Sequence, residues 1–337
     1  MDSFLLLTRP GFEADCAAEA DTRAALLGIS GFAKAKADNG FLQWSLTGGD
    51  ANGFPTPLIF AQRILPVVMP FTELSETDRV GDLLNLLPDN AVWNGLELCH
   101  ADTNEGRSLS GFLRGFGPHL ERGLKKAGRF KVKASATLCI FFIDSRQGFI
   151  CTADAEPVLP RLRLLAEAPS RSALKIEEAC LRFFNESERR QWLRPGMTAV
   201  DLGAAPGGWS WYLAKQGLKV TGVDHGRMQQ SLLENYPVVQ VSADAYTFRP
   251  HKQVDWVVCD VVEKPARTQA LMLKWLKQGW AKRALFNLKL PMKQRFRSVW
   301  PLLQELQDVL AEQGNYRVEA RQLYHDREEI TVLVMPA

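Results

Sequence analysis

Long hydrophobic runs are missing from this sequence. No apolar stretch approaches the roughly 18 residues that a membrane-spanning helix needs. The opening segment, MDSFLLLTRPGFEAD, reaches acidic side chains too early for a secretory signal. Both absences argue against membrane-spanning and secreted proteins, so we expect a cytoplasmic protein that does not bind a membrane.

Cysteine is scarce and scattered. The chain has six cysteines in 337 residues, with no C-x-x-C pair and no histidine beside them at metal-ligand spacing. This pattern argues against a zinc module and a disulfide framework, so we expect reduced, mostly buried thiols and no bound metal. Internal repeats and low-complexity tracts are also missing, which excludes solenoid and fibrous architectures.

Neither sign of charge dominates, but the charges are unevenly distributed. The formal net charge is only +3, yet residues 1–160 carry 15 basic and 19 acidic side chains, whereas residues 161–337 carry 26 and 19. Residues 264–297 contain ten Lys or Arg and no acid, and residues 107–133 contain eight against Glu121 alone. Two such stretches in an otherwise balanced chain indicate a polyanionic partner.

The chain is long enough for two or more domains, and its pattern changes along its length. Short apolar runs and turn signals predict a small α+β region, divided into a ferredoxin-like segment at 1–55 and a second domain at 56–154. The proline-containing segment 155–170 is expected to be a linker. From 171 to 337 strands and helices alternate, which predicts an α/β domain with a Rossmann-like, doubly wound sheet.

The expected elements follow from apolar periodicity. In the first region we expect strands at 96–101 and 136–143 and a helix at 109–127. In the second we expect helices at 173–185, 208–215, 267–278 and 298–313, and strands at 198–202, 219–223, 238–241, 256–260, 284–290, 317–322 and 331–334. Ligands of doubly wound sheets bind beyond the carboxyl ends of the strands, so residues there are the candidates for a site.

A glycine-rich turn, Asp201-Leu202-Gly203-Ala204-Ala205-Pro206-Gly207-Gly208, follows the first strand of the second domain. Glycines there let the backbone approach a ligand, and an acid at the strand end can hold an ammonium or hydroxyl group. The spacing is not the G-x-G-x-x-G of dinucleotide-binding domains, and Asp201 would repel a pyrophosphate. A zwitterionic adenosyl ligand fits better.

Two more acids end the next two strands. The carboxylate of Asp224 can accept hydrogen bonds from both hydroxyls of a ribose, and Asp244 can meet an adenine amino group. Each feature also has a purely structural interpretation, in which Gly207-Gly208 forms a tight turn and the two acids cap helices. Their coincidence at successive strand ends favours the cofactor site.

These residues resemble the cofactor loop of the FtsJ-type ribose 2′-O-methyltransferases, which depend on S-adenosylmethionine. The resemblance continues through residues 169–175, 258–265, 286–293 and 324–329 and includes 9–13 and 101–105, so it covers nearly the whole chain. It is strongest to a branch that methylates the ribose of one cytidine in 23S rRNA. The resemblance implies S-adenosylmethionine as the cofactor, with contacts from Ser172, Asp201, Gly203, Ala205, Pro206, Gly207, Gly208, Asp224, Asp244 and Asp260.

FtsJ-type enzymes use a Lys-Asp-Lys-Glu tetrad, which falls here on Lys175, Asp260, Lys289 and Glu329. The pattern agrees, because Asp260 and Lys289 end apolar strands, although Lys175 and Glu329 could instead be solvent-facing ion-pair members. Our hypothesis makes Lys289 the general base for a ribose hydroxyl, oriented by Asp260 and Lys175, with Glu329 completing the network. The sulfonium supplies the leaving group, so no metal is needed.

Other methyl acceptors fit less well. The fourth strand ends in Cys259-Asp260-Val261, whereas amino-group methyltransferases have Asn/Asp-Pro-Pro-aromatic there. Carbon-5 methylation of pyrimidines uses a cysteine that follows a proline, and Cys259 does not. We expect Cys259 to be a buried strand residue.

Both basic stretches are candidate RNA-binding surfaces. Residues 264–297 join the strands of Asp260 and Lys289, so we expect their charges to surround the acceptor site. Residues 112–133 resemble the RNA-facing part of a THUMP domain, which we place within 56–154, although a solvated helix face is the simpler alternative. Trp275, Trp280 and Phe296 are expected in the core. The RNA-binding candidates are Arg114, Arg122, Lys125, Lys126, Arg129, Lys131, Lys133, Lys293, Arg295 and Arg297.

Three functions remain open at this point. The first is methylation of 23S rRNA, the second is RNA binding by a methyltransferase fold without catalysis, and the third is O-methylation of a small molecule. The complete tetrad argues against the second and the basic stretches argue against the third. No heptad or edge-strand signal favours a dimer, so we expect a monomer.

Overall fold

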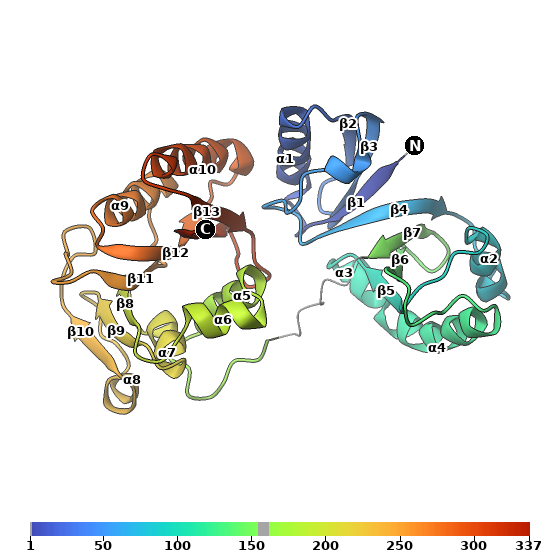
Figure 1. The fold of residues 1–337 in the computed structure, drawn as a ribbon. Coiled ribbons are helices and arrows are strands. Elements are labelled where there is room, and N and C mark those ends of the chain that lie inside the picture. The colour runs from blue at the N-terminus through green and yellow to red at the C-terminus, as the bar shows by residue number, and fades with distance from the viewer. Residues whose placement is uncertain (1, 154–161) are drawn as a thin grey trace. The chain divides into compact units, whose positions relative to one another are not determined.

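The computed structural model describes residues 2–153 and 162–337, which form two compact units, Met1–Val158 and Leu159–Ala337 (Figure 1). Each unit is built on one seven-stranded sheet. The expected linker 155–170 lies partly outside the described residues, and its described part, 162–170, contains no helix or strand.

The first unit is an α+β fold whose sheet has the order β2-β3-β1-β4-β7-β6-β5. Among the described residues of this unit, β5 and β6 are the only neighbouring strands that run parallel, and the other pairs are antiparallel. Its elements are β1 (Ser3–Leu7), α1 (Glu13–Leu26), β2 (Ser30–Ala35), β3 (Phe41–Gly48), β4 (Arg63–Phe71), α2 (Arg79–Leu86), β5 (Leu96–His100), α3 (Asn104–Ser108), α4 (Ser110–Lys126), β6 (Thr137–Phe142) and β7 (Gly148–Ala153), with a short 3₁₀ turn at Ala51–Gly53.

Strand β4 connects the two halves of the first unit. It pairs with β1 on one side and with β7 on the other, so the expected segments 1–55 and 56–154 share one sheet. The irregular chain before β4 is held by Glu19 of α1, whose buried carboxylate accepts the N–H groups of Ile59 at 2.7 Å and Phe60 at 3.0 Å. These bonds satisfy backbone donors that no strand pairs.

The second unit is the predicted Rossmann-like domain. Its sheet has the order β10-β9-β8-β11-β12-β14-β13, and Figure 1 shows α9 and α10 on one side of it and α5 and α7 on the other. Its elements are α5 (Ala173–Phe183), α6 (Glu186–Trp192), β8 (Thr198–Leu202), α7 (Gly208–Lys215), β9 (Lys219–Val223), α8 (Gln230–Asn235), β10 (Val238–Val241), β11 (Val254–Cys259), α9 (Pro265–Lys277), β12 (Ala281–Lys289), α10 (Arg295–Ala311), β13 (Tyr316–Arg321) and β14 (Glu329–Pro336).

The parallel part of this sheet comprises β8 to β12, and the last two strands depart from it. β14 runs antiparallel to β12, and β13 runs antiparallel to β14. A loop without a crossover helix joins β13 to β14, and such a connection makes neighbouring strands antiparallel. Strand β14 therefore begins at the edge of the sheet where the parallel strands end.

Hydrophobic residues fill both sides of the second sheet. Trp256 and Leu285 lie in one buried cluster with Trp209 of α7 and Ile176 of α5. Trp275 and Phe296 are buried as expected, with Trp280 half-buried, and Cys259 has no exposed surface (0 %). None of the helices that the structure describes is long and apolar enough to cross a membrane.

Candidate active site

Four charged side chains meet at one edge of the second sheet. The parallel strands β11 and β12 end at Cys259 and Lys289, so Asp260 and Lys289 reach the same edge. Glu329 begins the antiparallel strand β14 and stands opposite Lys289 in register. Lys175 comes from the first turn of α5. The structure thus brings together all four residues of the predicted tetrad.

The two lysines share the two carboxylates. Lys289 Nζ lies 2.6 Å from Asp260 Oδ1 and also pairs with Glu329 Oε2. Lys175 Nζ lies 3.1 Å from Asp260 Oδ2 and 2.5 Å from Glu329 Oε1. Each carboxylate offers one oxygen to each lysine, so the cluster is a closed ring with balanced charge. The solvent-facing alternative for Lys175 and Glu329 is wrong, because their side chains are only 18 % and 6 % exposed.

Burial opposes the charges of Asp260 and Lys289, but their charged and hydrogen-bonded neighbours outweigh burial. Burial raises the pKa of Asp260, while Lys289 and Lys175 lower it further than burial raises it. Burial lowers the pKa of Lys289, while Asp260 and Glu329 raise it above its ordinary value. The resting cluster therefore holds Lys289 as an ammonium ion.

Asn287 and Thr331 hold Asp260 through two successive hydrogen bonds. The sequence analysis did not predict either residue. Asn287 Nδ2 donates to Asp260 Oδ1 at 2.9 Å, and Thr331 Oγ1 donates to Asn287 Oδ1 at 2.8 Å. Both residues are fully buried. The available signal was an amide in the otherwise apolar run Ala-Leu-Phe-Asn-Leu, because a buried amide needs partners.

Glu178 fixes the loop that leads to Glu329, and it too was missed. Its buried carboxylate accepts the backbone N–H groups of Tyr324 at 2.8 Å and His325 at 2.9 Å, and it lies 2.7 Å from His325 Nδ1. Glu178 lies one turn after Lys175 on α5. One helix thus contributes a lysine to the cluster and anchors the segment that supplies its glutamate.

The glycine turn after β8 lies closely against its neighbours. Gly207 has φ +119° and Gly203 has φ +75°, values that side chains rarely allow. A Cβ at Gly208 would lie 2.2 Å from Ser172 Oγ and 2.5 Å from Ser170 Oγ. Ser172 therefore borders the turn that carries Ala205 and Pro206, so the predicted cofactor residues on 172 and 203–208 belong to one region.

The three acids at the strand ends have different surroundings. Asp201 is buried and accepts a hydrogen bond from Ser210 Oγ at 2.7 Å, and burial raises its pKa to about 7. Asp224 accepts the N–H groups of Ala205 at 3.0 Å and Gly226 at 2.7 Å, and the exposed Asp244 accepts that of Tyr246 at 2.6 Å. Neither is the N-cap of a helix, because the helices that follow them, α8 and α9, begin after Gln229 and Lys264.

These groups suit S-adenosylmethionine chemically. A buried acid, a strand-end carboxylate fixed by two backbone N–H groups and a glycine-rich turn are the features that an amino acid joined to a nucleoside requires. Asp260 lies one strand away from Asp201, because β8 and β11 are paired in the sheet. The predicted cofactor residues and the four-residue cluster therefore share one edge of the sheet.

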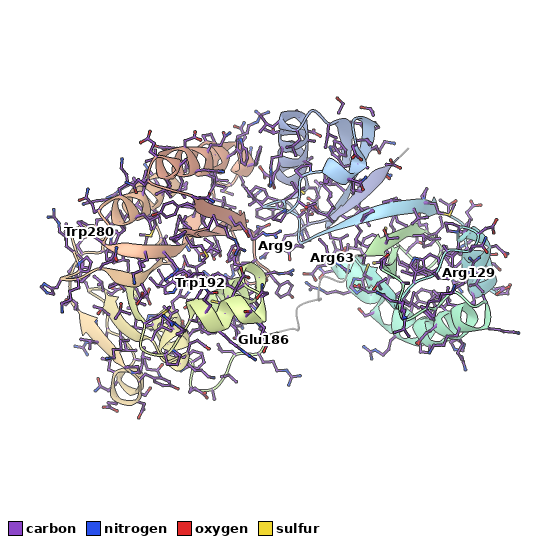
Figure 2. All side chains as sticks on the ribbon, in the orientation of Figure 1. Arg9, Arg63, Arg129, Glu186, Trp192 and Trp280 are labelled. Carbon is purple, nitrogen blue, oxygen red and sulfur yellow. The ribbon has the colours of Figure 1, made fainter. Side chains whose placement is uncertain are left out.

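The basic residues of 264–297 do not all surround this edge, which corrects the expectation. Helix α9 returns the chain to the opposite edge, so Lys274, Lys277, Lys282 and Arg283 lie toward the amino end of β12. Arg283 is buried, with its guanidinium 4.2 Å from the ring centre of Trp192 (labelled in Figure 2). Lys293 and Arg297 are exposed near the cluster, whereas Arg295 is paired with Glu328 at 2.9 Å.

The basic residues of the first unit are likewise divided. A groove of about 740 Å³ lies along β5 and α4, and Arg114, Lys125 and Lys131 line it together with His100 and Val132. Lys126 and Lys133 are exposed. Arg122 is exposed and bonds to His119, while Arg129 (labelled in Figure 2) donates to the backbone oxygens of Pro88 and Ala91. The groove thus collects three of the seven candidates.

One group of metal-type ligands occurs among the described residues. Glu97, Cys99 and Cys139 place their ligand atoms within 4.8 Å of one another. However, Arg63 donates two hydrogen bonds to Glu97, at 2.5 and 2.8 Å, and Cys99 Sγ lies 3.4 Å from Cys139 Sγ. The guanidinium already neutralises the carboxylate, so this group is an ion pair beside two thiols.

Two parts of the chain match known protein families. Residues 168–322 match the FtsJ-like methyltransferase family, and residues 1–63 match the RlmM ferredoxin-like domain. Among solved structures, TrmN from Thermus thermophilus is 15 % identical with a TM-score of 0.37 and covers 99 % of both chains. A TM-score this low supports no further comparison.

Relatives of known name match nearly the full length. Ribosomal RNA large subunit methyltransferase M from Alkalilimnicola ehrlichii is 44 % identical, over 98 % of this chain and 93 % of that one. The protein of the same name from Stutzerimonas stutzeri is 43 % identical, over 98 % of both chains. The chain therefore belongs to the ribosomal RNA large subunit methyltransferase M family and is an S-adenosylmethionine-dependent methyltransferase.

Proposed function

We propose that this protein methylates the 2′-hydroxyl of a cytidine ribose in 23S rRNA. The observation that carries the proposal is the closed ring of Lys175, Asp260, Lys289 and Glu329 beside the glycine turn. Burying two lysines and two carboxylates in one cluster is costly, because all four charges lose water. An RNA-binding protein without catalysis does not need such a cluster, whereas a catalytic site does.

The reaction requires a base and an oriented acceptor. When bound, S-adenosylmethionine would supply the methyl group from its sulfonium, and the neutral thioether S-adenosylhomocysteine would leave. A ribose hydroxyl is a weak acid, so its proton must leave as the oxygen attacks. Lys289 receives that proton, and Asp260 and Lys175 orient the lysine and the hydroxyl. Glu329 completes the ring.

Lys289 must first lose its own proton. Asp260 and Glu329 raise its pKa, so only a small fraction is neutral near pH 7, and this fraction grows tenfold for each unit that the pH rises. Methyl transfer should therefore accelerate toward alkaline pH. This expectation follows from the position of the two carboxylates.

Two surfaces support an RNA substrate. Lys293 and Arg297 are exposed beyond β12, at the edge where Lys289 lies. In the first unit, the groove belongs to the THUMP-like part, 56–154, and offers Arg114 and Lys131 to a phosphate backbone, whereas Lys125 is paired with Glu121 at 2.6 Å. A small-molecule acceptor requires neither surface. We place the protein in the cytoplasm with its ribosomal substrate and expect it to act as a monomer without a metal.

The decisive experiment uses rRNA from cells that lack this gene. Purified protein and labelled S-adenosylmethionine should label 23S rRNA at one cytidine ribose, and the K289M variant should bind the cofactor but transfer no label. K277M is the matched control, because Lys277 is exposed at the far end of α9. Label on a base, no label, or full turnover by K289M would overturn the proposal.

A further inference from the structure

A fifth ionisable residue lies behind the four-residue cluster. Asp326 belongs to the loop between β13 and β14 and has no exposed surface (0 %). Within 2–153 and 162–337, no lysine, arginine or histidine forms an ion pair with it. An isolated charge in such a place is costly, so burial favours the neutral acid.

The hydrogen bonds of Thr331 point to the same state. Thr331 Oγ1 lies 2.8 Å from Asn287 Oδ1, and it lies 3.1 Å from Oδ2 and 3.5 Å from Oδ1 of Asp326. Because the amide of Asn287 gives its N–H to Asp260, its oxygen needs a donor, and the single hydroxyl proton of Thr331 meets this need. The hydroxyl oxygen then faces Asp326 as an acceptor. Two acceptors would oppose each other there unless Asp326 carries a proton.

We propose that Asp326 is a protonated positioning residue whose carboxyl group donates to Thr331 and thereby holds Asn287 and Asp260 in place. The hydrogen bonds form a series in which each residue donates to the next, from Asp326 through Thr331 and Asn287 to Asp260. The N–H of Leu323 holds Asp326, the first member of this series, because it donates to Asp326 Oδ2 at 2.9 Å. The positioning role rests on the proposed function, because it assumes that Asp260 takes part in methyl transfer.

The surrounding charges agree with a neutral Asp326. Burial raises its pKa well above the ordinary value and Glu329 and Glu178 raise it as well, whereas the N–H of Leu323 and the charge of Lys175 lower it by less. A neutral Asp326 leaves two lysines balanced by two carboxylates. An ionised Asp326 would add a third negative charge and hold the proton on Lys289 more firmly, which opposes its action as a base.

The proton can be observed directly. In protein carrying ¹³C-labelled aspartate, the infrared difference between wild type and D326N at mildly alkaline pH should contain the C=O band of a protonated carboxyl group. A carboxylate band instead would overturn the proposal. This measurement does not use activity, so a failure of rRNA methylation would contradict the proposed function alone.

The positioning role is tested at Thr331, with circular dichroism to verify folding. T331V should lower kcat about tenfold, the effect of losing one buried hydrogen bond, and should leave the KM for RNA unchanged. T331S keeps the hydroxyl and should restore kcat. D308N, which changes an exposed acid on α10, is the control. Equal losses in T331V and T331S, or a loss confined to KM, would overturn the positioning role.

Discussion

Lys289 and Glu329 face each other across two antiparallel strands, because Lys289 is the last residue of β12 and Glu329 is the first residue of β14. A shift of one residue in this register would turn the two side chains to opposite faces of the sheet. Their contact is therefore set by strand pairing, and the rest of the cluster is assembled around it.

The first prediction concerns this pair. E329Q removes one of the carboxylates that raise the pKa of Lys289, so the pKa of the base should fall. The rising limb of kcat against pH should move to lower pH by the same amount, although the maximal rate should fall because the ring is broken. Rates measured across pH with saturating substrates test this.

The control for E329Q is E312Q, which neutralises an exposed glutamate after α10. It should leave the pH profile where it is. A profile of E329Q that stays in place or moves to higher pH would show that Lys289 is not the group that titrates.

The sequence predicted most of the strands of the second unit because they are buried and apolar, and β8, α7, β9 and β10 have the expected bounds. Asp260 and Lys289 could be found for the same reason, as charges that end such strands. Glu329 required the family resemblance, since no spacing in the sequence reveals that β14 runs antiparallel. Hydrogen bonds between distant segments, such as that of Asn287 with Thr331, depend on the final packing.

Charge runs were the least informative part of the sequence. Ten bases in 264–297 looked like one surface, but helix α9 distributes them over both edges of the sheet. Arg295 and Arg129 have local partners, which sequence counting does not reveal. Exposure and pairing therefore decide which cations can meet phosphates.

The second prediction concerns Asp201. Its pKa is about 7 in the folded chain, against an ordinary 3.8. Between these values the folded state keeps a proton that the unfolded state has lost, so stability falls as the pH rises across this window and the penalty is complete above it. D201N cannot ionise and should be more stable than wild type above pH 7, by at most about 4 kcal/mol.

Thermal unfolding without cofactor, measured from acidic to mildly alkaline pH, tests this expectation. The two melting curves should converge near pH 4. Calorimetric titration should show weaker binding of S-adenosylmethionine to D201N, because the amide cannot pair with an ammonium group. A variant that is less stable than wild type at pH 8, or that binds the cofactor equally well, would contradict this account.

The third prediction concerns the glycine turn. In G208A the new methyl group would lie 2.2 Å from Ser172 Oγ and 3.0 Å from the backbone nitrogen of Ala173. The serine can rotate, but the backbone of α5 cannot, so the turn must shift. We expect binding of S-adenosylmethionine to weaken at least about tenfold, since a displaced turn loses backbone contacts with its ligand.

G111A is the matched control, because a Cβ at this exposed position on α4 meets nothing within 4 Å. It should bind the cofactor normally and melt slightly higher, as expected for alanine in place of glycine in a helix. Normal cofactor affinity of G208A would show that the turn does not approach the ligand.

The last prediction concerns the groove of the first unit. If Arg114 and Lys131 each neutralise one phosphate of a single-stranded segment, R114E/K131E should weaken RNA binding and flatten its salt dependence. The slope of log K against log salt should fall by about 1.4, since each contact with single-stranded nucleic acid contributes about 0.7. K34E/K36E makes the same charge change at exposed residues by β2, outside the groove, and should keep the wild-type slope. Equal slopes for the two double variants would mean that RNA responds to net charge alone and does not occupy the groove.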